Sequence, residues 1–124
     1  MIGIVNCEIG NLGSLVNAFE FLGNEVSVIT RPDDVFTCQG LVLPGVGSFD
    51  HAMSALTALG FVSVLKSYVA ERNPLLGICL GMQLMCSETE EGSTQGLNIF
   101  DVSVKRFNSD LKVPQMGWNT LEEL

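Results

Sequence analysis

The sequence predicts an α/β fold with an open, mostly parallel sheet flanked by helices. Short apolar runs alternate along the chain with segments whose apolar residues recur at helical spacing. The runs are apolar throughout, as expected of parallel strands that helices cover on both faces. Because strand–helix–strand units pack side by side with right-handed crossovers, this order predicts one open sheet.

The amino-terminal half contains three predicted strands. The apolar run Ile2–Val5 is the first, and a helix follows over residues 12–22, which Gly23 closes. The runs Val26–Ile29 and Gly40–Leu43 are the second and third strands, each followed by a proline that favours a turn.

Two helices and a fourth strand follow. Apolar residues at helical spacing predict helices over residues 52–59, stopped by Gly60, and over 62–69, ending before a proline. Residues 75–78 read as the fourth strand. A short helical stretch after it is expected to hold residues 82–86, so that Cys86 lies on a helix.

Beyond residue 90 the pattern is more polar. Residues 90–94 predict a loop, and residues 99–107 alternate loosely, as an exposed strand does. Residues 111–118 contain Pro114 and are expected to be extended.

The composition indicates a single domain over residues 1–124. The formal net charge of −8 argues against nucleic acid or an anionic membrane as the main partner, since both reward clustered cations. No apolar run reaches the roughly 18 residues of a membrane span. The amino terminus lacks a basic region before its apolar residues, so we expect no signal peptide and a cytoplasmic protein with reduced thiols.

One of the four cysteines lies in a pattern that favours catalysis. Residues 77–81 read Gly-Ile-Cys-Leu-Gly between a predicted strand and a helix, which is the nucleophile-elbow arrangement with sulfur in place of oxygen. The glycines would relieve crowding at the sharp turn, where the residues two before and two after Cys79 approach each other. The N–H of Leu80 would face a developing oxyanion. A buried structural cysteine is the alternative for this pentapeptide, and packing or surface roles are expected for Cys7, Cys38 and Cys86.

A glycine-rich loop follows the third strand. Gly45 and Gly47 flank Val46 in the stretch 43–49, and such a loop exposes backbone N–H groups toward a ligand. In an open α/β sheet it lies at the same carboxyl edge as Cys79, where elbow hydrolases place their second oxyanion donor. The alternatives are an ordinary glycine-rich turn or a phosphate loop. The latter is disfavoured because no Gly-Lys-Ser/Thr follows.

At these residues the chain resembles the triad (class I) glutamine amidotransferases, and among them the glutaminase subunits of imidazole glycerol phosphate synthase. The matching stretches are residues 10–12, 43–49, 77–84 (GICLGMQL), 90–92 and 113–119 (VPQMGWN). The resemblance implies a flavodoxin-like sheet and hydrolysis of L-glutamine to glutamate and ammonia. It implies neither a metal nor an organic cofactor.

The resemblance also implies roles for individual residues. Cys79 would attack the glutamine amide, and the N–H groups of Val46 and Leu80 would form the oxyanion hole after residues 44–47 reorient. The substrate-binding residues would be Gly45, Gly47, Gln83 and Glu91. Taken singly, Gln83 could equally be a solvated helix residue and Glu91 a loop charge.

The implied partner is a (β/α)₈ cyclase subunit in a heterodimer, which consumes the ammonia in histidine biosynthesis. It would form imidazole glycerol phosphate and an aminoimidazole carboxamide ribotide. The residues expected toward that partner are Asn11, Met116, Gly117 and Trp118. A core position is the alternative for Trp118.

The sequence departs from the family pattern in one major respect. The family's triad ends with a His-Pro-Glu segment downstream of MGWN, which the 124 residues do not contain. The single histidine, His51, is expected to be a partly exposed helix residue. The chain therefore reads as the amino-terminal portion of the domain, inactive alone. The alternatives are a catalytically silent cyclase-binding fragment, a paralogue that supplies ammonia to a sugar-modifying pathway, and an unrelated thiol hydrolase.

Overall fold

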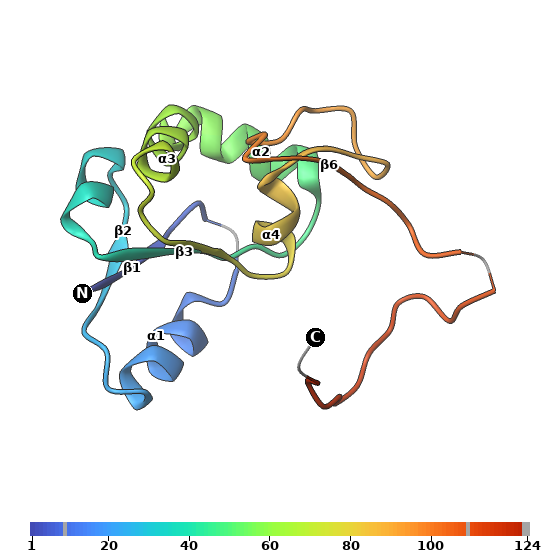
Figure 1. The fold of residues 1–124 in the computed structure, drawn as a ribbon, viewed down its shortest axis with the longest axis horizontal. Helices are drawn as coiled ribbons and strands as arrows, with labels where there is room; N and C mark the ends of the chain where they lie inside the picture. Colours follow the sequence, from blue (N-terminus) through green and yellow to red (C-terminus); the bar gives the residue numbers. More distant parts are fainter. Residues whose placement is uncertain (9, 109, 123–124) are drawn as a thin grey trace.

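A four-stranded parallel sheet forms the centre of the fold (Figure 1). The computed structural model describes residues 1–8, 10–108 and 110–122. The strand order is β2-β1-β3-β4 and every pairing is parallel. The strands are β1 (Ile2–Val5), β2 (Val26–Ile29), β3 (Gly40–Leu43) and β4 (Leu75–Gly77). This confirms the predicted open parallel sheet, with β4 one residue shorter than expected.

Helices cover both faces of this sheet (Figure 1). One face carries α1 (Leu12–Phe21), while α2 (Phe49–Ala58), α3 (Phe61–Ala70) and α4 (Leu80–Leu84) lie on the other. A 3₁₀ helix, η1 (Pro32–Thr37), connects β2 to β3 and had no counterpart among the predicted elements. The arrangement agrees with the predicted α/β class.

The chain after α4 differs from expectation at Cys86. We expected this residue on a helix, but α4 ends at Leu84, and Cys86 begins strand β5 (Cys86–Thr89). The strand pairs in parallel with β6 (Phe100–Val104), with Cys86 opposite Phe100. This long-range pairing overrides the local helical spacing of the apolar residues. The described residues beyond β6 run away from the sheet as irregular chain (Figure 1), in agreement with the expected extended segment.

The core lies between the sheet and helices α2 and α3. Its largest side chains that are fully buried include Phe49, Leu56, Phe61, Leu65 and Tyr68. The Tyr68 hydroxyl donates a hydrogen bond to the Cys38 carbonyl at 3.0 Å, which satisfies the one polar group of that ring. Burial raises the pKa of the Tyr68 hydroxyl.

Three of the cysteines belong to this interior. Cys7, Cys38 and Cys86 are buried, which confirms the packing role expected for them. Burial raises the pKa of the Cys86 thiol, so it stays protonated at neutral pH. Only Cys79 is exposed.

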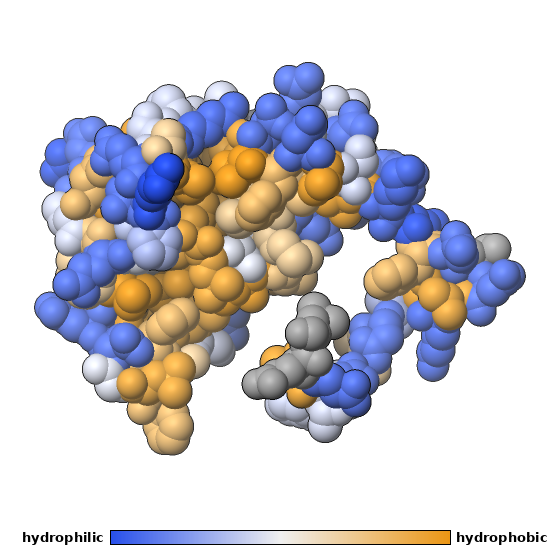
Figure 2. All heavy atoms as spheres, in the orientation of Figure 1, coloured by the Kyte–Doolittle hydropathy of each residue, from blue (hydrophilic) through white to orange (hydrophobic). Residues whose placement is uncertain are grey.

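The opposite face of the sheet is covered less completely. None of the residues of α1 is buried, and Phe19 and Leu76 line a hollow of about 310 Å³ between α1 and the sheet. Figure 2 shows apolar side chains gathered over this part of the molecule. The central strands β1 and β3 are therefore buried as predicted, while the edge strands β2 and β4 are partly exposed.

Within the described ranges, no single helix is long and apolar enough to cross a membrane. Helices α2 and α3 together meet the same criterion of length and composition, as a pair bent by 90°. Both helices contribute buried side chains to the core of the fold.

Candidate active site

Cys79 lies at the turn between β4 and α4, as the elbow pattern predicts. Its backbone has φ 55° and ψ −118°, a conformation that residues with a side chain rarely adopt. The sharp reversal leaves the thiol exposed rather than packed in the core. The alternative of a buried structural cysteine is therefore wrong.

The two glycines of the elbow are required by different neighbours. A Cβ at Gly77 would lie 2.6 Å from the Met82 Cα and 2.7 Å from the Met82 nitrogen. A Cβ at Gly81 would clash with the Leu43 carbonyl at the end of β3. The expected crowding is thus present at both glycines. Gly77 leaves room for the α4 backbone at Met82, and Gly81 leaves room for the Leu43 carbonyl of β3. Together the two glycines let α4 pack directly against the edge of the sheet.

The glycine-rich loop after β3 lies against this elbow. A Cβ at Gly45 would be 3.0 Å from the Gly81 nitrogen and 3.1 Å from the Leu80 Cβ. Gly47 has φ +93°, and Val46 between them is exposed. Leu80 is the first residue of α4, where a backbone N–H has no acceptor inside the helix. The structure therefore brings Val46 and Leu80 to one edge of the sheet.

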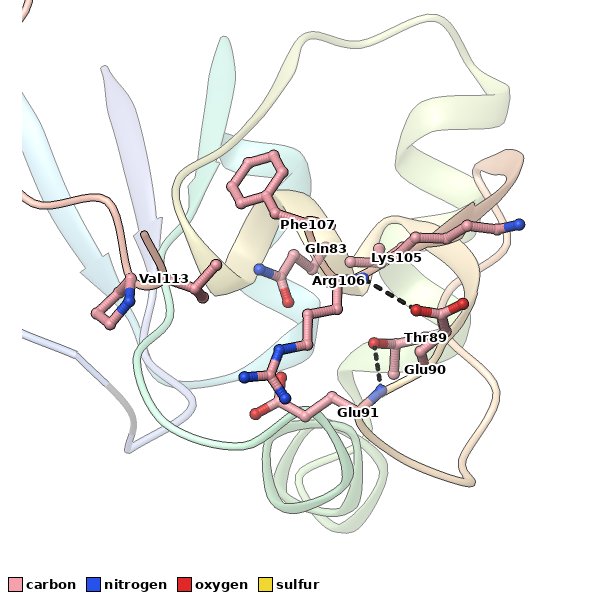
Figure 3. Close-up of a pocket in the computed structure, with 10 residues that line it drawn as sticks. Gln83, Thr89, Glu90, Glu91, Lys105, Arg106, Phe107 and Val113 are labelled. Atoms are coloured by element: carbon pink, nitrogen blue, oxygen red, sulfur yellow. Dashed lines mark hydrogen bonds between the residues drawn. The ribbon is translucent and has the colours of Figure 1, made fainter. Parts of the chain in front are cut away.

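A second feature of the site is a cavity of about 670 Å³ beside α4 (Figure 3). Gln83 and Glu91, both predicted to bind substrate, line it together. Its other lining residues are Thr89, Glu90, Val104, Lys105, Arg106, Phe107, Val113 and Pro114. Cys79 is not among the described lining residues. Cys79 nevertheless lies one helical turn from the cavity residue Gln83. The Gln83 N–H donates a hydrogen bond to the Cys79 carbonyl at 3.3 Å.

The loop that carries Glu91 is anchored at its amino-terminal end by β6. The Glu90 N–H donates to the Val104 carbonyl at 3.0 Å, and the Glu90 carboxylate accepts the Arg106 N–H at 3.0 Å. The Glu91 N–H donates to the Thr89 hydroxyl at 3.2 Å. These bonds hold the backbone of Glu91 beside the cavity.

Arg106 is a residue of this cavity that the motifs did not identify. Its side chain points toward the Glu91 carboxylate (Figure 3). The one available signal was its charge, since it adjoins Lys105 in a chain with only six Lys and Arg residues. The site thus contains an acidic and a basic group, which suits a ligand carrying both charges.

The residues expected at a partner interface are exposed but separate. Asn11 caps α1, its side chain accepting the Ser14 N–H at 3.3 Å. Met116 and Gly117 are exposed, and Trp118 is fully exposed and does not pack in the core formed by the described residues. No described contact brings Asn11 to these three residues.

His51 lies on α2 and is exposed, as expected.

Comparison with known families identifies the protein family to which this nucleophile-elbow arrangement belongs. The model of the SNO glutamine amidotransferase family matches residues 7–113, which include the elbow, the glycine-rich loop and the cavity residues Gln83 and Glu91. The chain belongs to this glutamine amidotransferase family. The predicted relationship to the glutamine amidotransferases is thereby confirmed.

Individual relatives carry a narrower name. Similar proteins of Chlorobium chlorochromatii (strain CaD3), Prochlorococcus marinus (strain MIT 9211) and Halalkalibacterium halodurans are each named imidazole glycerol phosphate synthase subunit HisH. They are 48%, 40% and 45% identical to this amidotransferase chain and cover 98%, 99% and 98% of it. The chain in turn covers 62%, 59% and 60% of their lengths.

A solved structure supports the fold. A protein described as "Crystal structure of glutamine amidotransferase" superposes with a TM-score of 0.71 at 20% sequence identity. The match covers 85% of this amidotransferase chain and 56% of that one. At this identity the similarity concerns the fold alone, and it agrees with the predicted flavodoxin-like α/β class.

Proposed function

We propose that this chain is the amino-terminal portion of a glutaminase subunit that hydrolyses L-glutamine to glutamate and ammonia. The ammonia would pass to a (β/α)₈ cyclase partner, bound as a heterodimer in the cytoplasm, for imidazole glycerol phosphate synthesis in histidine biosynthesis. The observation that carries the proposal is the exposed Cys79 at positive φ between β4 and α4. Family membership and the names of the similar proteins support glutamine as the substrate and the cyclase as the partner.

The chemistry begins at the thiolate of Cys79. The sulfur attacks the side-chain amide carbon of glutamine, and the carbonyl oxygen becomes an oxyanion that the N–H groups of Leu80 and Val46 stabilise. The Leu80 N–H is suited to this role by its position at the start of α4. The Val46 N–H would follow after residues 44–47 reorient, for which the glycines on both sides provide the freedom.

The second half of the reaction releases the products. The C–N bond breaks, an acid donates a proton to the departing ammonia, and a γ-glutamyl thioester remains on the sulfur. Water then hydrolyses the thioester to glutamate and frees the thiol. Both steps require a general acid–base, typically worth 10²–10⁴-fold in rate.

The cavity beside α4 supplies groups for the amino-acid end of the substrate. The Glu91 carboxylate complements the α-ammonium group of glutamine, and the Gln83 amide can donate to its carboxylate. Gly45 and Gly47 would let the loop approach the substrate backbone closely. Arg106 adds a cation that fits the α-carboxylate.

We also propose that the 124-residue chain alone does not turn over glutamine. His51 is its one imidazole, and it is exposed on α2. No described hydrogen bond or lining residue connects it to the elbow. A silent cyclase-binding unit is therefore the second candidate function for the chain in isolation.

The test uses a complete glutaminase–cyclase complex that contains this sequence. Cys79→Ala should abolish glutamate release from glutamine but leave synthesis from added ammonium intact, since ammonia bypasses the thiol. The buried Cys38→Ala is the matched control and should retain glutaminase activity. Glutamate release by Cys79→Ala near the wild-type rate would overturn the assignment.

A further inference from the structure

Asp50, near the start of α2, binds the loop that carries Glu91, although Asp50 and Ser93 are 43 residues apart in the sequence. Both of its carboxylate oxygens lie 3.1 Å from the Ser93 N–H, and one accepts the Thr94 N–H at 3.0 Å. The Ser93 hydroxyl adds a fourth contact at 3.3 Å. One side chain thus satisfies successive backbone donors of the loop that carries Glu91.

Gly92 provides the space for this contact. A Cβ at Gly92 would collide with the Asp50 carboxylate, with 2.8 Å separating it from the Asp50 Cγ. The carboxylate therefore lies directly against the Gly92 backbone, one residue after Glu91. The fit is specific, since any larger residue at this position would push the loop away from α2.

Asp50 is fixed on its own side by α2. It is the second residue of that helix, which begins directly after the glycine-rich loop, and its neighbour Phe49 is fully buried. A carboxylate in a first helical turn is favoured by the helix dipole. The backbone N–H groups of Thr94 and Ser93 lower the pKa of Asp50, so the group is charged at neutral pH.

The contact thereby connects the two segments assigned to glutamine binding, because α2 directly follows the glycine-rich loop. Gly47 lies three residues before Asp50, and Glu91 lies two residues before Ser93. The other end of the Glu91 loop is tied to β6 through Glu90. Between these two anchors, the backbone of Glu91 has little freedom to move relative to the glycine-rich loop.

We infer that Asp50 is a positioning residue that holds Glu91 at the correct distance from the glycine-rich loop to receive the α-ammonium group of glutamine. The inference rests on the proposed glutaminase function. In this role Asp50 does not touch the reacting atoms. It acts through Glu91, so its loss weakens recognition of the amino group more than the chemical step.

Substrate discrimination provides the test, in the complete glutaminase–cyclase complex. Glutaramate is glutamine without the α-amino group, so it gains nothing from Glu91. Asp50→Asn keeps the shape of the side chain but presents an NH₂ group to backbone donors. We expect it to raise the KM for glutamine about tenfold and to leave kcat within a few-fold of wild type. The ratio of kcat/KM for glutamine to that for glutaramate should fall by a similar factor.

Two further variants make the result specific. Gly92→Ala disturbs the same contact from the opposite side and should lower the same ratio, with little further effect in the double variant. Asp33→Asn is the matched control, since it removes an exposed carboxylate from the first turn of η1. It should leave the ratio unchanged.

The possible results distinguish a failure of the Asp50 positioning role from a failure of the proposed glutaminase function. An unchanged ratio in both Asp50→Asn and Gly92→Ala would overturn the positioning role while leaving the glutaminase intact. Equal losses toward glutamine and glutaramate would also overturn it, because they indicate general damage to the fold. A wild-type complex that releases no glutamate would overturn the proposed function, and this inference with it.

Discussion

The backbone of Cys79 carries a strain that two substitutions can measure. Its φ of 55° brings a Cβ close to neighbouring backbone atoms, at a cost of roughly 1–3 kcal/mol for a residue with a side chain. Cys79→Ala removes the sulfur and keeps the Cβ, whereas Cys79→Gly removes both. Because the side chain is exposed, neither substitution loses much packing. The difference in the free energy of unfolding between the two variants therefore reports on the backbone at residue 79 rather than on side-chain packing.

The expected difference follows from two opposing effects. Glycine relieves the strain of the folded state, but it also increases the freedom of the unfolded chain, which lowers stability by about 0.5–1 kcal/mol. We expect the strain to prevail, with Cys79→Gly more stable than Cys79→Ala by about 1 kcal/mol. For a chain of this size that difference raises the melting temperature by about 4 °C.

Urea unfolding followed by circular dichroism measures both variants at equilibrium. The matched control is Ser54, an exposed residue inside α2 with ordinary helical backbone. There the order should reverse, with glycine less stable than alanine by about 1 kcal/mol. If Cys79→Gly is less stable than Cys79→Ala, the elbow stores no strain and the reasoning fails.

Three other predictions address the partner, the pH dependence and the isolated chain. Since Trp118 is fully exposed, Trp118→Ala should change the free energy of unfolding of this chain by less than about 0.5 kcal/mol. The same substitution should weaken the free energy of binding to the cyclase, measured by calorimetry, by more than about 1 kcal/mol. A large fall in melting temperature would contradict this surface role. The pKa of Asp50 is lowered on folding, so its stabilisation is present above pH 3.8 and lost as the pH falls through the folded value. The stability gap between wild type and Asp50→Asn should thus shrink in acid, and a gap that widens below pH 3.8 would refute the ionised contact. Finally, the 124-residue chain should release glutamate no faster than its Cys79→Ala variant, even with the cyclase and its ligand added, and partner-stimulated turnover would disprove the need for a further base.

Local sequence patterns predicted most of the sheet and the elbow. An apolar run such as Gly40–Leu43 favours a buried parallel strand, and three of the four strands have the predicted bounds. The glycines around Cys79 marked a turn too tight for side chains, and the structure contains that turn. What the local pattern could not provide was the identity of the crowding atoms, since the Leu43 carbonyl reaches Gly81 only through pairing of β3 with β4.

The tertiary structure alone decided the contacts between distant segments. Cys86 has helical spacing with its neighbours, but its pairing with Phe100 places it in a strand. Similarly, nothing near Asp50 in the sequence indicates that it binds Ser93, because that contact depends on how α2 packs beside the loop after β5. The sequence by itself predicted most of the elements and the candidate nucleophile Cys79, because strand periodicity and glycine spacing act over a few residues. The geometry around Glu91 required the folded chain, since β6 and Asp50 anchor its loop from elements far apart in the sequence.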